Sequence, residues 1–212
     1  MTFVGVDVGA QRLHVVVLGS GGGVVDGRVL AAADLKSLIE VCGGAECVAI
    51  DAPDSLSTAP HKADGVAGGK PLAPKFQNAR CAEIGLGIQC GIWVPWATPE
   101  QDSPGWMAVG IQVFAQVRTA GVPAIEVYPH AGFRSLAGWK KLAKKTEPAG
   151  IAERTDLLRK AGVDDRWLAL WSHDALDAAL AAVVARDRVL GTASAATCGH
   201  DGSAIWLPAS LD

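Results

Sequence analysis

The stretch Phe3-Val4-Gly5-Val6-Asp7-Val8-Gly9 opens the chain with an apolar run that an acidic residue interrupts near its end. A second, valine-rich run covers residues 13–18, a glycine-rich turn follows at 19–23, and residues 24–30 alternate loosely between polar and apolar. Glycine-rich turns supply the positive φ angles that hairpins need. The three runs therefore predict an antiparallel meander of three strands.

Amphipathic segments and short apolar runs alternate along the rest of the chain. Buried strands are expected at residues 46–51 and 122–128, and an edge strand at 204–208. The expected helices cover residues 34–41, 76–90, 106–119, 130–139, 149–161 and 172–189. A meander followed by helix-linked strands predicts an α/β fold with mixed strand pairing.

Composition limits the class of protein. Half of the 212 residues are apolar and 19% are charged, which excludes a disordered chain and a coiled coil. The formal net charge of −3 argues against a protein that coats nucleic acid by charge alone, while a local basic patch stays open. No apolar run approaches the ~20 residues of a membrane span, and the first residues lack a basic signal region, so we expect no membrane contact.

Five cysteines are an odd number, and none forms a Cys-x-x-Cys pair. This pattern predicts neither a disulfide framework nor a zinc ribbon, and a reducing cytoplasm is the expected setting. The length suits one domain over residues 1–212. Oligomeric state is not predicted.

Three acidic residues lie inside apolar segments, each near the end of an expected strand. Asp7 lies in FVGVDVG, Asp51 ends CVAID, and Glu126 lies in AIEVY. If the three strands are parallel, the carboxylates emerge at one edge of the sheet, where α/β sheets form their ligand sites. Asp51 has an alternative role as a cap of the turn before Pro53.

The segment Ser172-His173-Asp174-Ala175-Leu176-Asp177 begins the last expected helix. At 100° per residue, Asp177 lies on the same face as the apolar residues that follow it, so it should face the sheet. Asp174 either joins Asp177 or stabilises the positive end of the helix. Several carboxylates in one place repel one another, and a hard divalent cation, Mg²⁺ or Mn²⁺, removes that cost.

Four motifs together carry a family resemblance. They are Val4-Gly5-Val6-Asp7-Val8-Gly9, Ala49-Ile50-Asp51-Ala52-Pro53, Glu126-Val127-Tyr128-Pro129-His130 and His173-Asp174-Ala175-Leu176-Asp177-Ala178. Their order and spacing resemble the domain-of-unknown-function 429 (DUF429) family, regarded as predicted nucleases with an RNase H-like fold. The resemblance implies a mixed five-stranded sheet flanked by helices, with a helical insertion between strands four and five at about residues 52–120.

The resemblance also implies a chemistry. The acid layout is similar to that of Holliday-junction resolvases, in which such residues hold two metal ions about 4 Å apart for phosphodiester hydrolysis. It implies Asp7, Asp51, Asp174 and Asp177 as metal ligands, with Glu126 and His173 as further catalytic candidates. His173 and His130 would relay protons, or else only cap and pack.

Basic residues suggest where a nucleic acid would bind. Lys144 and Lys145 belong to a dense patch at helix-like spacing, which either contacts phosphates or forms a solvated helix face. Arg80 is a substrate-binding candidate or an internal partner of Glu83. With His130, these residues are the expected substrate-binding set.

Two other functions stay open at this stage. Asp7-Val8-Gly9 weakly fits the phosphate hairpin of actin-like ATPases and sugar kinases, which would make the protein an ATP-binding phosphotransferase. A non-catalytic binding module that retains the fold is the third possibility.

Overall fold

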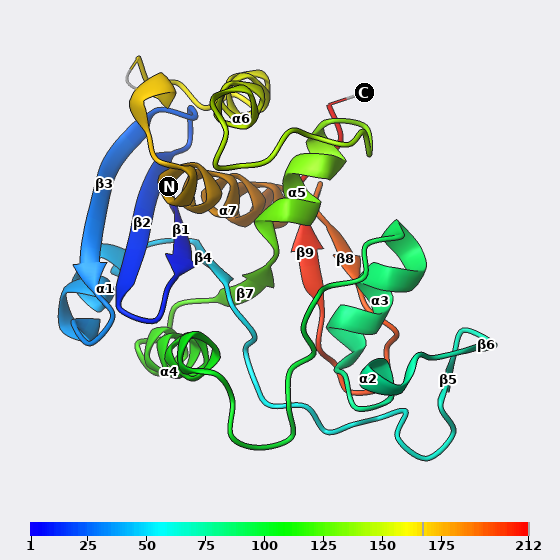
Figure 1. Cartoon of the computed structure of the whole chain (residues 1–212). Helices are drawn as coiled ribbons and strands as arrows, with labels where there is room; N and C mark the ends of the chain where they lie inside the picture. Colours follow the sequence, from blue (N-terminus) through cyan, green and yellow to red (C-terminus); the bar gives the residue numbers. More distant parts are fainter. Residues whose placement is uncertain (167, 212) are drawn as a thin grey trace.

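The computed structural model describes residues 1–166 and 168–211 and folds them into a central sheet with helices on both faces (Figure 1). The sheet has seven strands in the order β3-β2-β1-β4-β7-β9-β8. The strands are β1 (Thr2–Val8), β2 (Arg12–Gly19), β3 (Val24–Ala31), β4 (Cys47–Asp51), β7 (Ala124–Val127), β8 (Ser194–Ala196) and β9 (Ile205–Leu207).

The directions of the strands identify the fold class. β1, β2 and β3 form an antiparallel meander, and β4 and β7 add parallel to β1. β1 is thus the strand of the meander that also pairs with the parallel strands, which is the RNase H-like arrangement, and the expected fold class is confirmed.

The sheet differs from the expected five strands at its far edge. β9 pairs parallel with β7, and β8 pairs antiparallel outside β9, so the C-terminal strand is internal and β8 is the edge. The sequence Ser194-Ala195-Ala196 carries no β-branched or aromatic residue, which is why its strand was not predicted.

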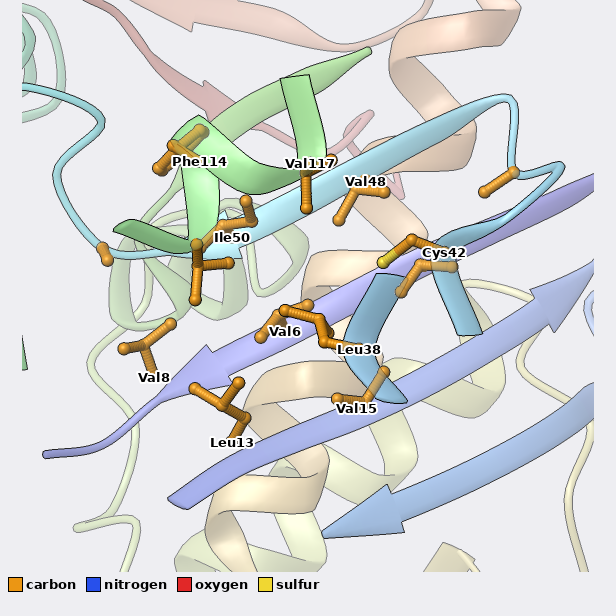
Figure 2. Close-up of a cluster of buried hydrophobic side chains, with 14 of the residues drawn as sticks. Val6, Val8, Leu13, Val15, Leu38, Cys42, Val48, Ile50, Phe114 and Val117 are labelled. Atoms are coloured by element: carbon orange, nitrogen blue, oxygen red, sulfur yellow. The ribbon is translucent and has the colours of Figure 1, made fainter. Parts of the chain in front are cut away.

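Helices cover the two faces of the sheet. They are α1 (Leu35–Cys42), α2 (Pro74–Gln77), α3 (Cys81–Cys90), α4 (Gly105–Thr119), α5 (Pro129–Leu136), α6 (Pro148–Lys160) and α7 (His173–Leu190), with a short 3₁₀ turn η1 at Leu168–Leu170. The even-numbered residues of β1 and β4, such as Val6 and Ile50, pack against α1 and α4 (Figure 2). The odd-numbered residues face α7, because side chains alternate along a strand.

The segment between β4 and β7 is the one that we expected to be an insertion. It contains α2, α3, α4 and a small hairpin of β5 (Val66–Ala67) and β6 (Lys70–Pro71). The expected helix over residues 76–90 is broken before α3, where the backbone N–H of Arg80 donates to Glu83 in a capping arrangement. α3 lies beside β8 and β9 (Figure 1).

The cysteines correct one expectation. Cys81 at the start of α3 and Cys198 after β8 form a disulfide, with their Cα atoms 4.7 Å apart. Sequence spacing gave no sign of this pair, because 117 positions separate the two residues. Within residues 1–166 and 168–211, no helix has the length and apolar character to cross a membrane.

Helix α7 lies unusually close to β1, and Gly5 is the reason. A Cβ atom built on Gly5 would lie 2.0 Å from the carbonyl oxygen of Ala178 and 2.3 Å from the amide of Ala182. The facing side of α7 is rich in alanine, so two backbones meet with no large side chain between them. This contact sets the height of α7 above the strands that carry Asp7 and Asp51.

Replacing Gly5 tests the contact. We expect Gly5→Ala to lower the free energy of unfolding by about 3 kcal/mol or more, at the upper end of overpacking costs, because the atoms it would strike are backbone. The matched control is Gly27→Ala on β3, where a Cβ meets nothing within 4 Å. Urea unfolding that finds equal stabilities for the two variants contradicts the analysis.

Candidate active site

Asp7 and Asp51 lie side by side at the ends of two parallel strands. The register of β1 and β4 pairs Asp7 directly with Asp51, and paired residues of parallel strands point to the same face. That face is the one covered by α7, since Asp7 shares its parity with Gly5. The two carboxylates are close enough for a hydrogen bond.

The first turns of α7 add two more carboxylates. Ser172 caps the helix by accepting a hydrogen bond from the amide of Ala175 at 3.2 Å, which fixes where α7 begins. Asp174 lies in the first turn, and Asp177, one turn further and 3% exposed, faces the sheet as the sequence predicted. Both carboxylates lie near enough to Asp7 to raise its pKa by repulsion.

Lys145 reaches into this group of acids. Its Nζ lies 2.7 Å from Oδ2 of Asp177. Burial disfavours the ammonium, but the attraction of Asp177 and the hydrogen bond to it prevail, so the pKa of Lys145 is raised. Lys145 is therefore charged at neutral pH and offsets part of the negative charge.

The segment that carries Lys145 is a loop, whereas the spacing of its lysines suggested a helix. Residues 140–147 have no helical backbone. The loop is fixed to α6: Arg154 donates to the carbonyl oxygens of Ala143 and Gly150, at 3.1 and 2.9 Å. A Cβ on Gly150 would lie 2.0 Å from the carbonyl oxygen of Lys144, so glycine is required for this approach.

His14 is a site residue that the sequence analysis missed. It pairs with Asp7 across β1 and β2, and its Nδ1 lies 3.6 Å from Oδ2 of Asp7. Ligand atoms of Asp7, His14 and Asp174 lie within 4.8 Å of one another. The register of the first hairpin contained the signal, because a short turn after Val8 brings residue 14 opposite residue 7.

Burial and mutual repulsion raise the pKa values of three of these carboxylates. Burial, then repulsion by Asp177 and Asp174, raises the pKa of Asp7 to about 7. Burial and repulsion by Asp7 raise the pKa of Asp51 well above its usual range. Burial also raises the pKa of Asp177, against the opposing effect of Lys145. The protein alone does not neutralise these groups, which is the condition under which a cation binds.

Two cavities flank the acids. One, of about 640 Å³, is lined by Asp7, His14 and Asp51 together with the rings of Trp96 and Trp106. The other, of about 430 Å³, is lined by Asp51, His130, Lys144, Arg154 and Asp177, among others. Asp51, Tyr128 and Lys145 border both cavities, so these three residues lie between them.

The two histidine candidates lie at different places. Nδ1 of His173 is 2.6 Å from Oδ1 of Asp174, and ligand atoms of His173, Asp174 and Asp177 lie within 4.8 Å of one another. His130 is exposed at the start of α5 and borders only the smaller of these cavities. His173 thus adjoins the acids directly, whereas His130 lies at their periphery.

Glu126 is not brought to the cluster. In the β4–β7 register it pairs with Ile50, so it points to the α4 face of the sheet, opposite to Asp51. There its two oxygens receive hydrogen bonds from Arg80 at 2.7 and 2.6 Å. The sequence placed Glu126 on the correct strand but not on the correct face.

Arg80 is likewise an internal residue. It is 1% exposed and bonds Glu83, Glu126 and Asp54, so it offers no surface to a substrate. The alternative of an internal pair with Glu83 is the one observed. Lys144 is 83% exposed and lies 3.5 Å from Glu147, at the mouth of the smaller of the two cavities.

Comparison with known proteins gives a family model that matches part of the chain and several similar solved structures. The profile of a family described as "Protein of unknown function (DUF429)" matches residues 107–200. The resemblance to this family is therefore confirmed over a segment that includes Lys145, Asp174 and Asp177. No curated protein matches the chain.

Two of the similar solved structures are of RuvC from Thermus thermophilus. The structure titled "Thermus thermophilus RuvC structure" has 18% identity and a TM-score of 0.46, covering 91% of this chain and 98% of that one. The structure titled "T. thermophilus RuvC in complex with Holliday junction substrate" has 17% identity and a TM-score of 0.42, covering 98% and 99%.

Removal of Arg80 tests its internal role. We expect Arg80→Ala to lower the free energy of unfolding by about 3–5 kcal/mol, because it leaves Glu83 and Glu126 buried without their positive partner. Adding Glu126→Gln to that variant should recover part of the loss. Chemical denaturation measures both, and an Arg80→Ala protein of unchanged stability contradicts the placement.

The pH dependence of stability tests the raised pKa of Asp7. Because its pKa is raised to about 7 in the folded chain, the folded state binds more protons than the unfolded state between about pH 4 and pH 7. The metal-free protein should therefore lose stability relative to Asp7→Asn as the pH rises through this window, by a few kcal/mol at about 1.4 kcal/mol per unit of pKa difference. Parallel stability curves for the two proteins, measured with a chelator present, contradict the prediction.

Proposed function

We propose that this protein is a metal-dependent nuclease, a hydrolase of phosphodiester bonds in nucleic acid. The observation that carries the proposal is the meeting of Asp7, Asp51, Asp174 and Asp177 from β1, β4 and α7 beside the ammonium of Lys145. Burial and repulsion by neighbouring acids raise the pKa of Asp7, Asp51 and Asp177, as expected where negative charge is in excess. An excess of this kind suits a site for divalent cations rather than an interior salt bridge.

The donor set fits Mg²⁺ or Mn²⁺. All four ligands offer hard carboxylate oxygens, and no cysteine borders either cavity among the described residues. Asp7, Asp51, Asp174 and Asp177 would hold the ions, two of which are expected. Bound ions of this type lower the pKa of a water and stabilise the leaving oxygen of a phosphodiester.

The chain's own residues have separate tasks in this proposal. Lys145 holds a positive charge beside Asp177, where it neutralises a non-bridging phosphate oxygen. His14 accepts a proton at Nδ1, next to Oδ2 of Asp7. His173, with its Nδ1 2.6 Å from Oδ1 of Asp174, would offset the charge of Asp174 when it is protonated. Glu126 and Arg80 serve only to anchor the segment after β4 to the sheet.

The cavities suggest how a polynucleotide would lie. The rings of Trp96 and Trp106 meet edge to face with their centroids 5.5 Å apart and border the cavity beside Asp7, where a base would stack on the accessible part of these rings. Lys144 and His130 border the other cavity, where they contact phosphates on the far side of the cleavage point. We expect such a nuclease in the cytoplasm, where nucleic acid and Mg²⁺ are both present.

The ATP-binding alternative loses its main support. A phosphate hairpin needs the free amide of Gly9, yet this N–H donates to the carbonyl oxygen of Arg12 at 2.9 Å and closes the β1–β2 turn. Thermal stabilisation by Mg²⁺ with ATP, and not by Mg²⁺ alone, would favour that alternative.

Cleavage assays test the proposal. The purified protein is incubated with labelled single-stranded, duplex and branched DNA and with RNA, in Mg²⁺, Mn²⁺ or chelator. We expect metal-dependent cleavage, lowered at least about a hundredfold by Asp7→Asn, since a lost ion removes several kcal/mol of transition-state stabilisation.

The control is Asp156→Asn, an exposed carboxylate on α6 that pairs only with Lys160 among the described contacts. It should keep full activity. Cleavage that survives Asp7→Asn indicates a contaminating nuclease, and no cleavage of any substrate together with no Mn²⁺-induced rise in Tm favours a binding module.

A further inference from the structure

A second group of metal-ligating side chains lies away from the candidate active site. It consists of His61 in the loop after β4, Cys81 at the start of α3, and Cys198 after β8. One ligand atom from each lies within 4.8 Å of the others. None of the three borders either cavity beside Asp51, so the group belongs to a different part of the molecule.

His61 is the residue that calls for an explanation. It is 2% exposed, and its Nε2 lies 3.3 Å from Sγ of Cys198. Its Nδ1 makes no hydrogen bond but lies 3.5 Å from Oδ1 of Asp64. A buried imidazole between a sulfur and a carboxylate has the arrangement of a metal ligand whose second nitrogen is oriented by an acid.

Backbone groups around Sγ of Cys81 suit a negatively charged ligand atom. The backbone N–H of His200 donates to this sulfur at 3.3 Å. Cys81 is also the first residue of α3, where the positive end of the helix dipole lies. The ring of His200 lies against that of His61, with centroids 4.7 Å apart, so His200 is a neighbour of the group.

We propose that the reduced protein binds a zinc ion through Cys81, Cys198 and His61, with His200 beside it. Thiolate and imidazole are the ligands that Zn²⁺ takes in structural sites, and a mixed Cys/His set selects it over Mg²⁺. The ion joins the segment after β4 to the β8–β9 hairpin. A Cβ on Gly85 would lie 2.3 Å from the amide of Thr197, so α3 packs closely onto this hairpin and the backbone that carries Cys81 and Cys198 is already in place.

The disulfide and the zinc site are alternative states of the same sulfurs. A phosphine reductant opens the S–S bond by taking the oxygen of one water molecule as phosphine oxide, while both protons of that water go to the sulfurs. Zn²⁺ then displaces the two thiol protons into the buffer. In a tetrahedral site with Zn–S bonds of about 2.3 Å the sulfurs lie about 3.8 Å apart, which rotation of the two side chains supplies.

Metal binding to the reduced protein tests the proposal. The protein is reduced with the phosphine, freed of metal, and titrated with CoCl₂ or ZnCl₂ in excess Mg²⁺, which keeps the carboxylate site filled. We expect about one equivalent bound, a thiolate-to-cobalt charge-transfer band in the near ultraviolet, and a rise in Tm with ZnCl₂. This measurement involves no catalysis, so its result does not depend on whether the protein is a nuclease.

Substitutions identify the ligands. Cys81→Ser and His61→Ala should each abolish the charge-transfer band or weaken zinc binding at least tenfold, and Asp64→Asn should weaken it roughly tenfold. Cys90→Ser, a part-exposed free cysteine on the same helix, is the matched control and should bind zinc normally.

One result overturns the proposal even if a variant fails to fold. That result is a wild-type protein with five free thiols, shown by circular dichroism to be folded, that takes up no zinc and gives no cobalt band. The pair would then act only as a disulfide. Cobalt binding that persists unchanged in the Cys81→Ser variant would also overturn the proposal.

Discussion

The contact between α7 and β1 at Gly5 is the constraint on which the candidate site depends. Two backbones pack with no side chain between them because Gly5 faces Ala178 and Ala182. The helix therefore lies low enough for Asp177 to reach the level of Asp7 and Asp51. A helix held one side-chain layer higher would leave Asp177 in the core without acidic neighbours, and the charge that defines the site would be dispersed.

Charge is distributed unequally between the two faces of the sheet. On the α4 face, Glu83, Glu126 and Asp54 share the guanidinium groups of Arg80 and Arg118, so each of these three carboxylates has an ion-pair partner and the network is internal. On the α7 face, the described residues show one ion pair between the four aspartates and a lysine or arginine, that of Asp177 with Lys145. Acidic side chains are thus structural on one face and candidates for chemistry on the other, because their positive partners are more numerous on the first face.

Strand position was predictable from the sequence, whereas side-chain orientation was only partly so. Apolar runs ending in Asp7 and Asp51 indicate parallel strands, and helical periodicity places Asp177 toward them. Glu126 lies in an equally apolar run, but β7 has only four residues, and so short a strand does not reveal which face of the sheet Glu126 points to. Lys145 reaches the acids through a loop whose path is set by Arg154 and Gly150, and loop paths leave no periodic signal.

The link between Cys81 and Cys198 encloses more than half of the chain, including α4, β7 and α5 to α7. A protease that cuts once inside this span, for example in the loop that carries Lys145, would leave both halves of the polypeptide tethered. The cut molecule would migrate as one species until the sulfurs are released. Such a cut would thus not separate α7, which carries Asp174 and Asp177, from the strands that carry Asp7 and Asp51.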